Sequence, residues 1–262
     1  MTDSAQPTDP PALVTYDVSG RVARVTLDSP RNRNALSTHL LDELLRALES
    51  AAEDESVRVV VLGHTGGTFC AGVDLNEVTG EDDPNTARGI RLTAVMRAIA
   101  AHRCPVVGQI DGHVRAGGVG LVAACDLVVA GPKSTFALTE SRLGLAAFVI
   151  SLTVLPRLTS RAAARYFLTG ETFDAATARE IGLVTEAAED AEAGAGELVE
   201  RLTQASPQGL AESKALVNRQ LLARFDHDRE WAIEQSARLF ASSEAREGMA
   251  AFLAKRPPSW LA

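Results

Sequence analysis

Short apolar runs alternate with helical segments through the first half of the chain, and this alternation restricts the possible folds more than any other feature. Two β-rich runs, at residues 13–18 and 21–27, are joined by a Ser-Gly pair and predict a hairpin. Residues 57–62, VRVVVL, have the pattern of a buried strand and lie between helical segments at 37–54 and 88–101. Such strand–helix alternation predicts βαβ-type units and an α/β layer.

Helical patterns dominate after about residue 149. We place a boundary near residue 200, so that residues 12–200 form the α/β core and residues 201–262 a helical oligomerisation region. Residues 1–11 contain Pro and Asp but no Lys or Arg, and we expect a disordered tail there. The apolar faces of the C-terminal helices must be buried on the core or on another subunit. The helices expected in the second half are 160–169, 174–181, 195–205, 208–225, 228–240 and 243–254.

The charge balance excludes several classes of partner. Lys and Arg number 26 against 34 Asp and Glu, a net charge of −8, whereas nucleic acids and anionic membranes attract a positive surface. The most apolar stretch, residues 116–130, contains Asp126 and is too short to cross a bilayer. Three cysteines without a CxxC pair indicate a reducing compartment, and no His, Asp or Glu set has metal-ligand spacing. We therefore expect a cytoplasmic protein without a bound metal and without membrane insertion.

Two Gly-rich segments, residues 65–75 and 111–121, each follow a predicted strand and lead into a predicted helix. Neither fits GxxxxGK[ST] or GxGxxG, so nucleotide binding is not indicated. Each segment alone is explained by a tight strand-to-helix turn. Together they are consistent with an oxyanion hole, in which two backbone N–H groups from separate loops stabilise one developing negative oxygen.

The chain resembles the crotonase (enoyl-CoA hydratase/isomerase) superfamily from about Val14 to its C-terminus. The resemblance implies an α/β spiral of ββα units with a C-terminal helical trimerisation region, assembled as a homotrimer or a dimer of trimers. It also implies an acyl-CoA thioester as substrate, with no separate cofactor because coenzyme A is part of that substrate. The segments that carry the resemblance are RVARVTLDSPRNRNAL, FCAGVDL, DGHVRAGGVGLVAACDLVVA, TESRLGL, YFLTGETFDAATAREIGLV and EGMAAFLAKRPP.

The same resemblance assigns catalytic roles. It implies that the backbone N–H groups of Ala71 and Gly117 form the oxyanion hole. Hydratases of this family commonly use two glutamates; the first position is Gly120 here, and the second matches Glu140. Glu140 would then act alone or with a water molecule, with its pKa raised by an apolar pocket.

Further residues are expected to contact the substrate. Arg115 could pair with a substrate carboxylate, because Arg binds carboxylates through two hydrogen bonds, or it could face solvent or the CoA phosphates. His113 is interpreted as a structural hydrogen-bonding residue rather than a base. The predicted substrate-binding residues are Arg33, Ala35, Leu36, Cys70, Gly72, Val73, Asp74, Leu75, His113, Arg115, Gly118, Gly120 and Leu143.

From these features we predict an enoyl-CoA hydratase that adds water to a 2-enoyl-CoA. A branched or carboxylated acyl chain is one form that this substrate could take. Two alternatives stay open. One is a Δ3-Δ2 enoyl-CoA isomerase, because single-glutamate members of the family include such enzymes. The other is a member that binds acyl-CoA without turnover, which the missing glutamate at Gly120 favours.

Overall fold

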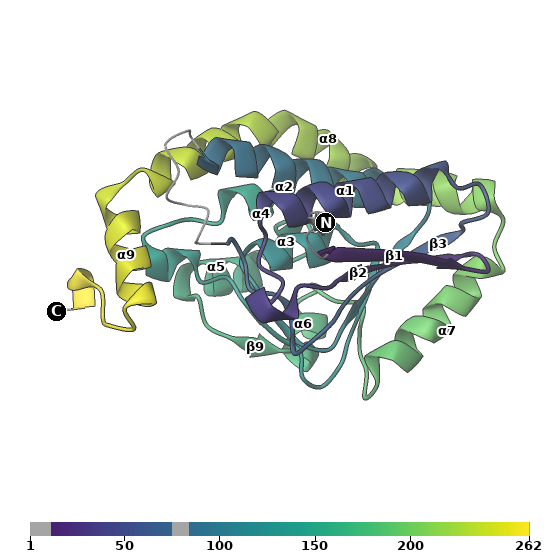
Figure 1. Ribbon diagram of the computed structural model, residues 1–262, viewed down its shortest axis with the longest axis horizontal. Coiled ribbons are helices and arrows are strands. Elements are labelled where there is room, and N and C mark those ends of the chain that lie inside the picture. The colour runs from purple at the N-terminus through teal and green to yellow at the C-terminus, as the bar shows by residue number, and fades with distance from the viewer. Residues whose placement is uncertain (1–11, 75–83, 262) are drawn as a thin grey trace, which may run out of the picture.

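The computed structural model describes residues 12–74 and 84–261 (Figure 1). The predicted tail, residues 1–11, lies outside the described residues. Within them, the strands form two sheets, one of six strands in the order β1-β2-β3-β5-β7-β10 and one of four in the order β4-β6-β8-β9. The strands of the larger sheet are β1 (Val14–Ser19), β2 (Val22–Leu27), β3 (Val59–His64), β5 (Val106–Ile110), β7 (Leu127–Ala130) and β10 (Glu186–Ala187). Those of the smaller sheet are β4 (Thr68–Cys70), β6 (His113–Arg115), β8 (Thr135–Ala137) and β9 (Phe173–Asp174).

From β3 to β8, successive strands alternate between the two sheets. β3, β5 and β7 pair in parallel in the larger sheet, and each is followed by a short strand, β4, β6 or β8, which pair in parallel in the smaller one. Helices α2 (Pro84–Ala101) and α3 (Gly117–Ala124) then follow β4 and β6. After β8 come the 3-10 helix η3 (Glu140–Leu143) and α4 (Phe148–Val154). The chain therefore forms the expected α/β spiral of ββα units.

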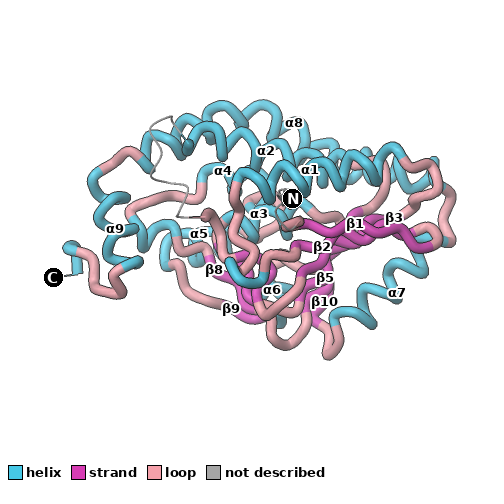
Figure 2. The backbone as a smooth tube through the Cα atoms, in the orientation of Figure 1, coloured by secondary structure: helices cyan, strands magenta, loops and turns pink. Residues whose placement is uncertain are grey.

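Helices cover both faces of the six-stranded sheet (Figures 1 and 2). On one face, α1 (Thr38–Glu53) buries a stripe of leucines, and its N-terminus is capped by Ser37 Oγ, which accepts the Leu40 N–H at 3.2 Å. On the other face, α7 (Ala191–Thr203) packs Ala191 and Ala195 against valines of β3, β5 and β7. The remaining helices are η1 (Pro30–Asn32), α5 (Ser160–Thr169), α6 (Ala175–Glu180), α8 (Pro207–Phe240), α9 (Ser243–Leu253) and η4 (Ser259–Leu261).

The C-terminal region differs from the expected pattern. The two helices expected at 208–225 and 228–240 are one continuous helix, α8. The polar residues between them interrupt the apolar pattern but include no helix breaker, and Asp226 accepts a hydrogen bond from Arg97 Nε of α2 at 2.7 Å. α7 also begins earlier than residue 195, because Asp190 caps it by accepting the N–H groups of the first turn. No helix in the described part of the chain is long and apolar enough to cross a membrane.

A buried polar cluster fixes α8 on the core. Lys214 Nζ lies 2.6 Å from Asp126 Oδ2 and donates to the carbonyl groups of Ile99 and Cys104 at 2.8 and 3.0 Å. Asn218 Nδ2 donates to the other oxygen of Asp126 at 2.8 Å. Burial of the Lys214 charge is thus compensated by three acceptors, which is the condition for tolerating a buried ion pair. Removing either partner would leave the other charge buried, so this cluster sets the register of α8.

Helix α9 approaches η3 through two glycines. A Cβ atom at Gly248 would lie 2.4 Å from the Leu143 carbonyl oxygen, and one at Gly144 would lie 2.7 Å from the Glu244 carbonyl carbon. Gly144 also has φ of +71°, a conformation that favours glycine. Because η3 begins with Glu140, the docking of α9 and the placement of Glu140 are coupled.

We expect Gly248→Ala to lower the free energy of unfolding by about 1–3 kcal/mol, because the added methyl group must displace α9 from backbone atoms of Leu143. Gly196→Ala on α7 is the matched control, since a Cβ there has no neighbour within 4 Å and alanine favours the helix by up to about 1 kcal/mol. Urea unfolding of both variants is the measurement. Equal stability of the two variants would show that close packing does not require Gly248.

Candidate active site

Three parallel strands of the smaller sheet end side by side. β4 ends at Cys70, β6 at Arg115 and β8 at Ala137, and the register pairs Cys70 with Val114 and Arg115 with Ala137. The carboxyl ends of neighbouring parallel strands lie at one edge of a sheet, where ligand sites of α/β folds are found. The segments that follow these strands therefore converge, although they are far apart in the sequence.

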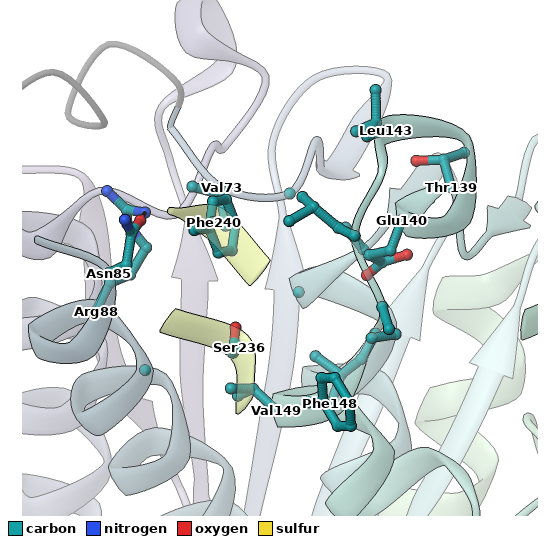
Figure 3. Close-up of a pocket in the computed structure, with 18 of the residues that line it drawn as sticks. Val73, Asn85, Arg88, Thr139, Glu140, Leu143, Phe148, Val149, Ser236 and Phe240 are labelled. Carbon is teal, nitrogen blue, oxygen red and sulfur yellow. Dashed lines mark hydrogen bonds between the residues drawn. The ribbon is translucent and has the colours of Figure 1, made fainter. Parts of the chain in front are cut away.

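A cavity of about 150 Å³ lies where these segments meet α2, α4 and the two C-terminal helices (Figure 3). Backbone of the Gly-rich segments forms one part of its wall, and apolar side chains form most of the rest. Its lining residues are Ala71, Gly72, Val73, Asn85, Arg88, Gly89, Leu92, Ala116, Gly117, Thr139, Glu140, Leu143, Leu145, Ala146, Ala147, Phe148, Val149, Ile150, Ser236, Phe240, Met249 and Phe252.

Glu140 supplies a buried carboxyl group in this cavity. Although the residue as a whole is partly exposed, its Oε2 atom is buried and has no hydrogen-bond partner among the described residues. Burial raises the pKa of Glu140 to about 7. A carboxyl group with that pKa can both accept and return a proton near neutral pH, which suits general acid–base chemistry.

The structure corrects the first of the two expected oxyanion-hole donors. The Ala71 N–H donates to the Arg33 carbonyl oxygen at 3.0 Å, so it is occupied within the protein. Gly72, with φ of +96°, redirects the backbone, and its carbonyl accepts the Leu36 N–H at 2.8 Å. Val73 lines the cavity, and its N–H has no acceptor among the described residues. Val73, two residues beyond Ala71, therefore offers the available N–H.

Gly117, the other expected donor, lines the cavity. It is the first residue of α3, and the first N–H groups of a helix have no acceptor inside the helix. A Cβ at Gly117 would lie 2.6 Å from Leu36 Cδ1, so close packing requires glycine here. The preceding residue, Ala116, has φ of 46° and ψ of −117°, a strained conformation for a residue with a side chain. Strain at Ala116 thus accompanies the turn that begins α3 at the cavity wall.

Asn34 anchors the loop beside these donors. It is fully buried with φ of 51°, and its Oδ1 accepts the Ser29 N–H at 2.7 Å. Its Nδ2 donates to the carbonyl groups of Thr65 and Thr68 at 3.2 and 2.8 Å. These bonds tie the loop after β2 to the connection between β3 and β4. The Arg33 carbonyl is thereby held where it accepts the Ala71 N–H.

Gly120 does not line the cavity. A Cβ at this position would lie 2.6 Å from Ile150 Cγ2 and 2.8 Å from Met96 Sδ. The space in which a first glutamate would begin is therefore filled by apolar atoms. Among the described lining residues, Glu140 is the only carboxyl group.

The other predicted substrate-binding residues divide into two groups. The cavity brings together Gly72, Val73 and Leu143 with Glu140, Ala71 and Gly117. Leu75 lies outside the described residues. Predicted residues that do not line the cavity are Arg33, Ala35, Leu36, Cys70, Asp74, His113, Arg115, Gly118 and Gly120.

Local bonding accounts for several of these placements. The Arg115 guanidinium donates to the carbonyl and hydroxyl oxygens of Thr135 at 2.7 and 2.9 Å, so the expectation that Arg115 holds a substrate carboxylate in this cavity does not fit. His113 is exposed and lies 2.8 Å from the same hydroxyl, as a structural hydrogen-bonding residue would. Asp74 accepts a hydrogen bond from Asn32 at 2.8 Å. Cys70 is fully buried, and burial raises the pKa of its thiol to about 12.

Sequence reasoning missed the polar side of the cavity and its C-terminal wall. Asn85 and Arg88 come from the first turns of α2, and Ser236 and Phe240 from the end of α8. Phe240 belongs to the C-terminal helices, for which the sequence predicted only buried apolar faces, and no motif distinguishes Arg88 from other polar residues of its helix. No group of three His, Cys, Asp or Glu residues suited to a metal ion occurs in the described part of the chain.

Comparisons with known proteins show what the chain is similar to. A family model described as enoyl-CoA hydratase/isomerase matches residues 17–262. An enoyl-CoA hydratase structure from Mycobacterium avium is 58% identical, with a TM-score of 0.90, covering 96% of this chain and 100% of that one. The 2,3-dehydroadipyl-CoA hydratase of Escherichia coli is 32% identical over 92% of this chain and 95% of its own length. Enoyl-CoA hydratase domain-containing protein 2 of Mus musculus, a mitochondrial protein, is 33% identical over 92% of this chain and 84% of its own length.

We expect Ala116→Gly to raise the free energy of unfolding by roughly 1 kcal/mol. Relief of the backbone strain, about 1–3 kcal/mol, outweighs the extra entropy of glycine in the unfolded chain, about 0.4–1 kcal/mol. Ala241→Gly is the control, because Ala241 ends α8 with φ of −77° and relieves no strain. Chemical denaturation measures both. A loss of stability in both variants would contradict strain at Ala116.

The raised pKa of Glu140 predicts a pH-dependent stability. Between its ordinary pKa of 4.5 and its folded value of about 7, the folded state binds the proton more tightly than the unfolded state, so stability falls as pH rises through this range. Glu140→Gln has no such proton. We expect the variant to exceed the parent by up to about 3 kcal/mol at pH 8 and to match it near pH 4. Glu171→Gln is the control, because the ion pair with Arg165 lowers the pKa of Glu171 and its pH dependence of stability should have the opposite sign. If the stability difference between Glu140→Gln and the parent did not change with pH, the burial of the Glu140 carboxyl group would be contradicted.

Proposed function

The chain belongs to the enoyl-CoA hydratase/isomerase family, and from this we propose that it adds water across the double bond of a 2-enoyl-CoA thioester. One observation supports the proposal above the rest. A buried carboxyl group with a pKa near 7 shares a small apolar cavity with two backbone N–H groups that have no other described acceptor. That combination stabilises an enolate oxygen and moves protons at the adjacent carbons.

In the proposed reaction, the thioester oxygen accepts hydrogen bonds from the N–H groups of Val73 and Gly117. The Glu140 carboxylate takes a proton from a water molecule as the water oxygen bonds to C3, and the double-bond electrons move onto the thioester oxygen. Protonated Glu140 then returns that proton to C2, and the thioester carbonyl is restored. One water is consumed, and the carboxylate is regenerated without a cofactor or metal.

A single carboxyl group limits how the steps can be arranged. With Gly120 packed against Ile150 and Met96, no second carboxylate can share the work from that position without displacing core atoms. Glu140 must therefore serve first as base and then as acid. A pKa near 7 supports this double role, because both protonation states are populated at neutral pH.

The same single carboxyl group supports the second candidate, a Δ3-Δ2 enoyl-CoA isomerase. In that reaction, Glu140 would take a proton from C2 of a 3-enoyl-CoA and return it to C4, with the enolate held by the same two N–H groups. The absence of a second carboxylate among the described lining residues favours this alternative. Hydration stays the first proposal because the compared relatives are named as hydratases.

A carboxylated acyl chain and an oligomeric state belong to the same proposal. The Escherichia coli relative is named for a dicarboxylic acyl-CoA, which supports a carboxylated substrate for this chain. Leu216 and Val217 of α8 are each 73% exposed, which supports burial of that helix face in a homotrimer or a dimer of trimers. We also propose that the protein is cytoplasmic. The exposed side chain of Arg33 would contact the phosphates of coenzyme A.

The expected assay result is loss of enoyl absorbance when the purified protein is incubated with crotonyl-CoA or 3-methylglutaconyl-CoA. Glu140→Gln should lower kcat at least about 100-fold, because the variant can neither take nor return a proton. Glu171→Gln, a partly exposed site outside the cavity, is the control and should keep parental kcat.

The other outcomes identify the alternatives. Conversion of 3-hexenoyl-CoA into an absorbing 2-enoyl product without hydration would support the isomerase. Tight binding of all three thioesters without turnover, unchanged in Glu140→Ala, would support a non-catalytic acyl-CoA-binding protein.

A further inference from the structure

We propose that His64 is a positioning residue that holds the two Gly-rich segments at a fixed spacing. It does so through one hydrogen bond, in which the Asp111 N–H donates to His64 Nε2 at 3.1 Å. The inference rests on the proposed function in taking the N–H groups of Val73 and Gly117 as the donors to the thioester oxygen. It goes beyond that function by naming a side chain outside the cavity lining that controls how far apart the two donors lie.

The hydrogen bond joins the two segments where they begin. His64 is the last residue of β3, and the segment that follows it contains β4 and Val73. Asp111 follows directly after β5, and the segment that it begins contains β6 and Gly117. The two segments are therefore connected before either of them reaches the cavity.

The pairing of β4 with β6 specifies this spacing only weakly. The register pairs Thr68 with His113 and Cys70 with Val114, so β4 advances two residues where β6 advances one, and the ladder is irregular between these pairs. Two three-residue strands with such an irregularity have few ladder bonds that resist a shift of one strand along the other. A shift would change the distance between the two donors, so a contact outside the ladder is needed to keep it constant.

The imidazole ring of His64 is itself held in place. Its Nδ1 lies 3.4 Å from the Thr65 carbonyl oxygen, which also accepts a hydrogen bond from Asn34 Nδ2 at 3.2 Å. The Phe69 ring packs edge-to-face against the imidazole, with the ring centroids 5.6 Å apart. A Cβ at Gly112 would lie 2.9 Å from His64 Cε1, so the backbone of the second segment packs directly on the ring. The ring therefore transmits its position to both segments.

The hydrogen bond requires a neutral imidazole with its proton on Nδ1. Only an unprotonated Nε2 has the lone pair that accepts the Asp111 N–H. Burial lowers the pKa of His64, which keeps the ring neutral near neutral pH, whereas the Thr65 carbonyl and the Asp111 carboxylate act in the opposite direction. That carboxylate is paired with Lys133, whose Nζ lies 3.0 Å from Asp111 Oδ2. The state of the ring thus suits its role as an acceptor.

His102 provides the matched comparison. It is also buried, its Nδ1 accepts the Cys104 N–H at 3.0 Å, and its Nε2 lies 3.2 Å from the Leu48 carbonyl oxygen. These partners belong to α1 and to the connection before β5, outside both Gly-rich segments. The variants His64→Leu and His102→Leu therefore each remove a ring that accepts a backbone N–H, but only the first removes the link between the segments.

The decisive measurement is the infrared carbonyl stretch of bound butyryl-CoA, a saturated thioester that cannot be hydrated. Hydrogen bonds to the thioester oxygen lower the frequency of this stretch, so the frequency reports whether the backbone donors reach the oxygen. We expect the parent to lower it on binding. His64→Leu should lose at least half of this lowering while butyryl-CoA affinity changes less than about threefold, because the donors are displaced but the rest of the cavity is kept. His102→Leu should keep the lowering, and His64→Gln, whose amide oxygen can replace Nε2 as acceptor, should restore most of it.

The same pattern should appear in turnover of crotonyl-CoA. We expect His64→Leu to lower kcat at least about tenfold with a change in KM of less than about threefold, since a misplacement of about 1 Å can cost roughly 100-fold. His102→Leu should lose stability in urea unfolding, as His64→Leu should, but should keep parental kcat.

Three results would overturn the proposal. The first is a parent that does not lower the carbonyl frequency, and the second is a His64→Leu variant that lowers it as the parent does. The third is an equal loss in His64→Leu and His102→Leu, which would reduce His64 to a residue of general stability. If His64→Leu does not fold, His64→Asn takes its place, because the shorter amide stays polar without reaching the Asp111 N–H.

Because butyryl-CoA does not turn over, the infrared outcome is separate from the hydration assay. A carbonyl frequency that depends on His64, without hydration of any 2-enoyl-CoA, would retain the positioning role and reject the hydratase. Hydration with a frequency that does not depend on His64 would do the reverse.

Discussion

The register of three very short parallel strands is the constraint on which the site depends. β4, β6 and β8 each have three residues, yet their pairing brings the segments after Cys70, Arg115 and Ala137 to one edge. Each of these strands follows directly from a strand of the larger sheet, so the core of the larger sheet positions the smaller one. The functional groups lie two or three residues beyond the strand ends, which leaves little freedom for them to move apart. The site is thus a consequence of backbone pairing more than of any one side chain.

Burial gives the single carboxyl group its chemical character. The atoms of Ile150 and Met96 that occupy the space beside Gly120 belong to the same apolar packing that surrounds the cavity. Helix α9 completes the enclosure by docking on η3 through Gly144 and Gly248. An apolar wall disfavours the charged form of Glu140, and this is the physical origin of its raised pKa. Packing that stabilises the fold therefore also sets the proton affinity needed for the proposed reaction.

Sequence patterns predicted the parts of the fold that bury apolar side chains at regular spacing. The α1 segment and the valine run of β3 carry such spacing, and the α/β class followed from their alternation. Three-residue strands carry no periodicity, so the smaller sheet was expected only through the family resemblance. At Asp226 the apolar pattern of α8 is interrupted although the helix continues, and the contact of Asp226 with Arg97 comes from a helix distant in the sequence. The assignment of Ala71 as a donor was wrong because its N–H is taken by the Arg33 carbonyl, and neither that contact nor the positive φ of Gly72 can be read from a residue type.

The burial of Cys70 beside the Gly-rich segment has a practical consequence. A thiol with a pKa of about 12 contains almost no thiolate at neutral pH, and the thiolate is the form that oxidants and alkylating agents attack. The Gly72 N–H also donates to its sulfur at 3.3 Å. Cys104 and Cys125 are also buried, and burial raises the pKa of both thiols, so maleimide labelling of any of the three cysteines would report unfolding rather than the chemistry of the folded site.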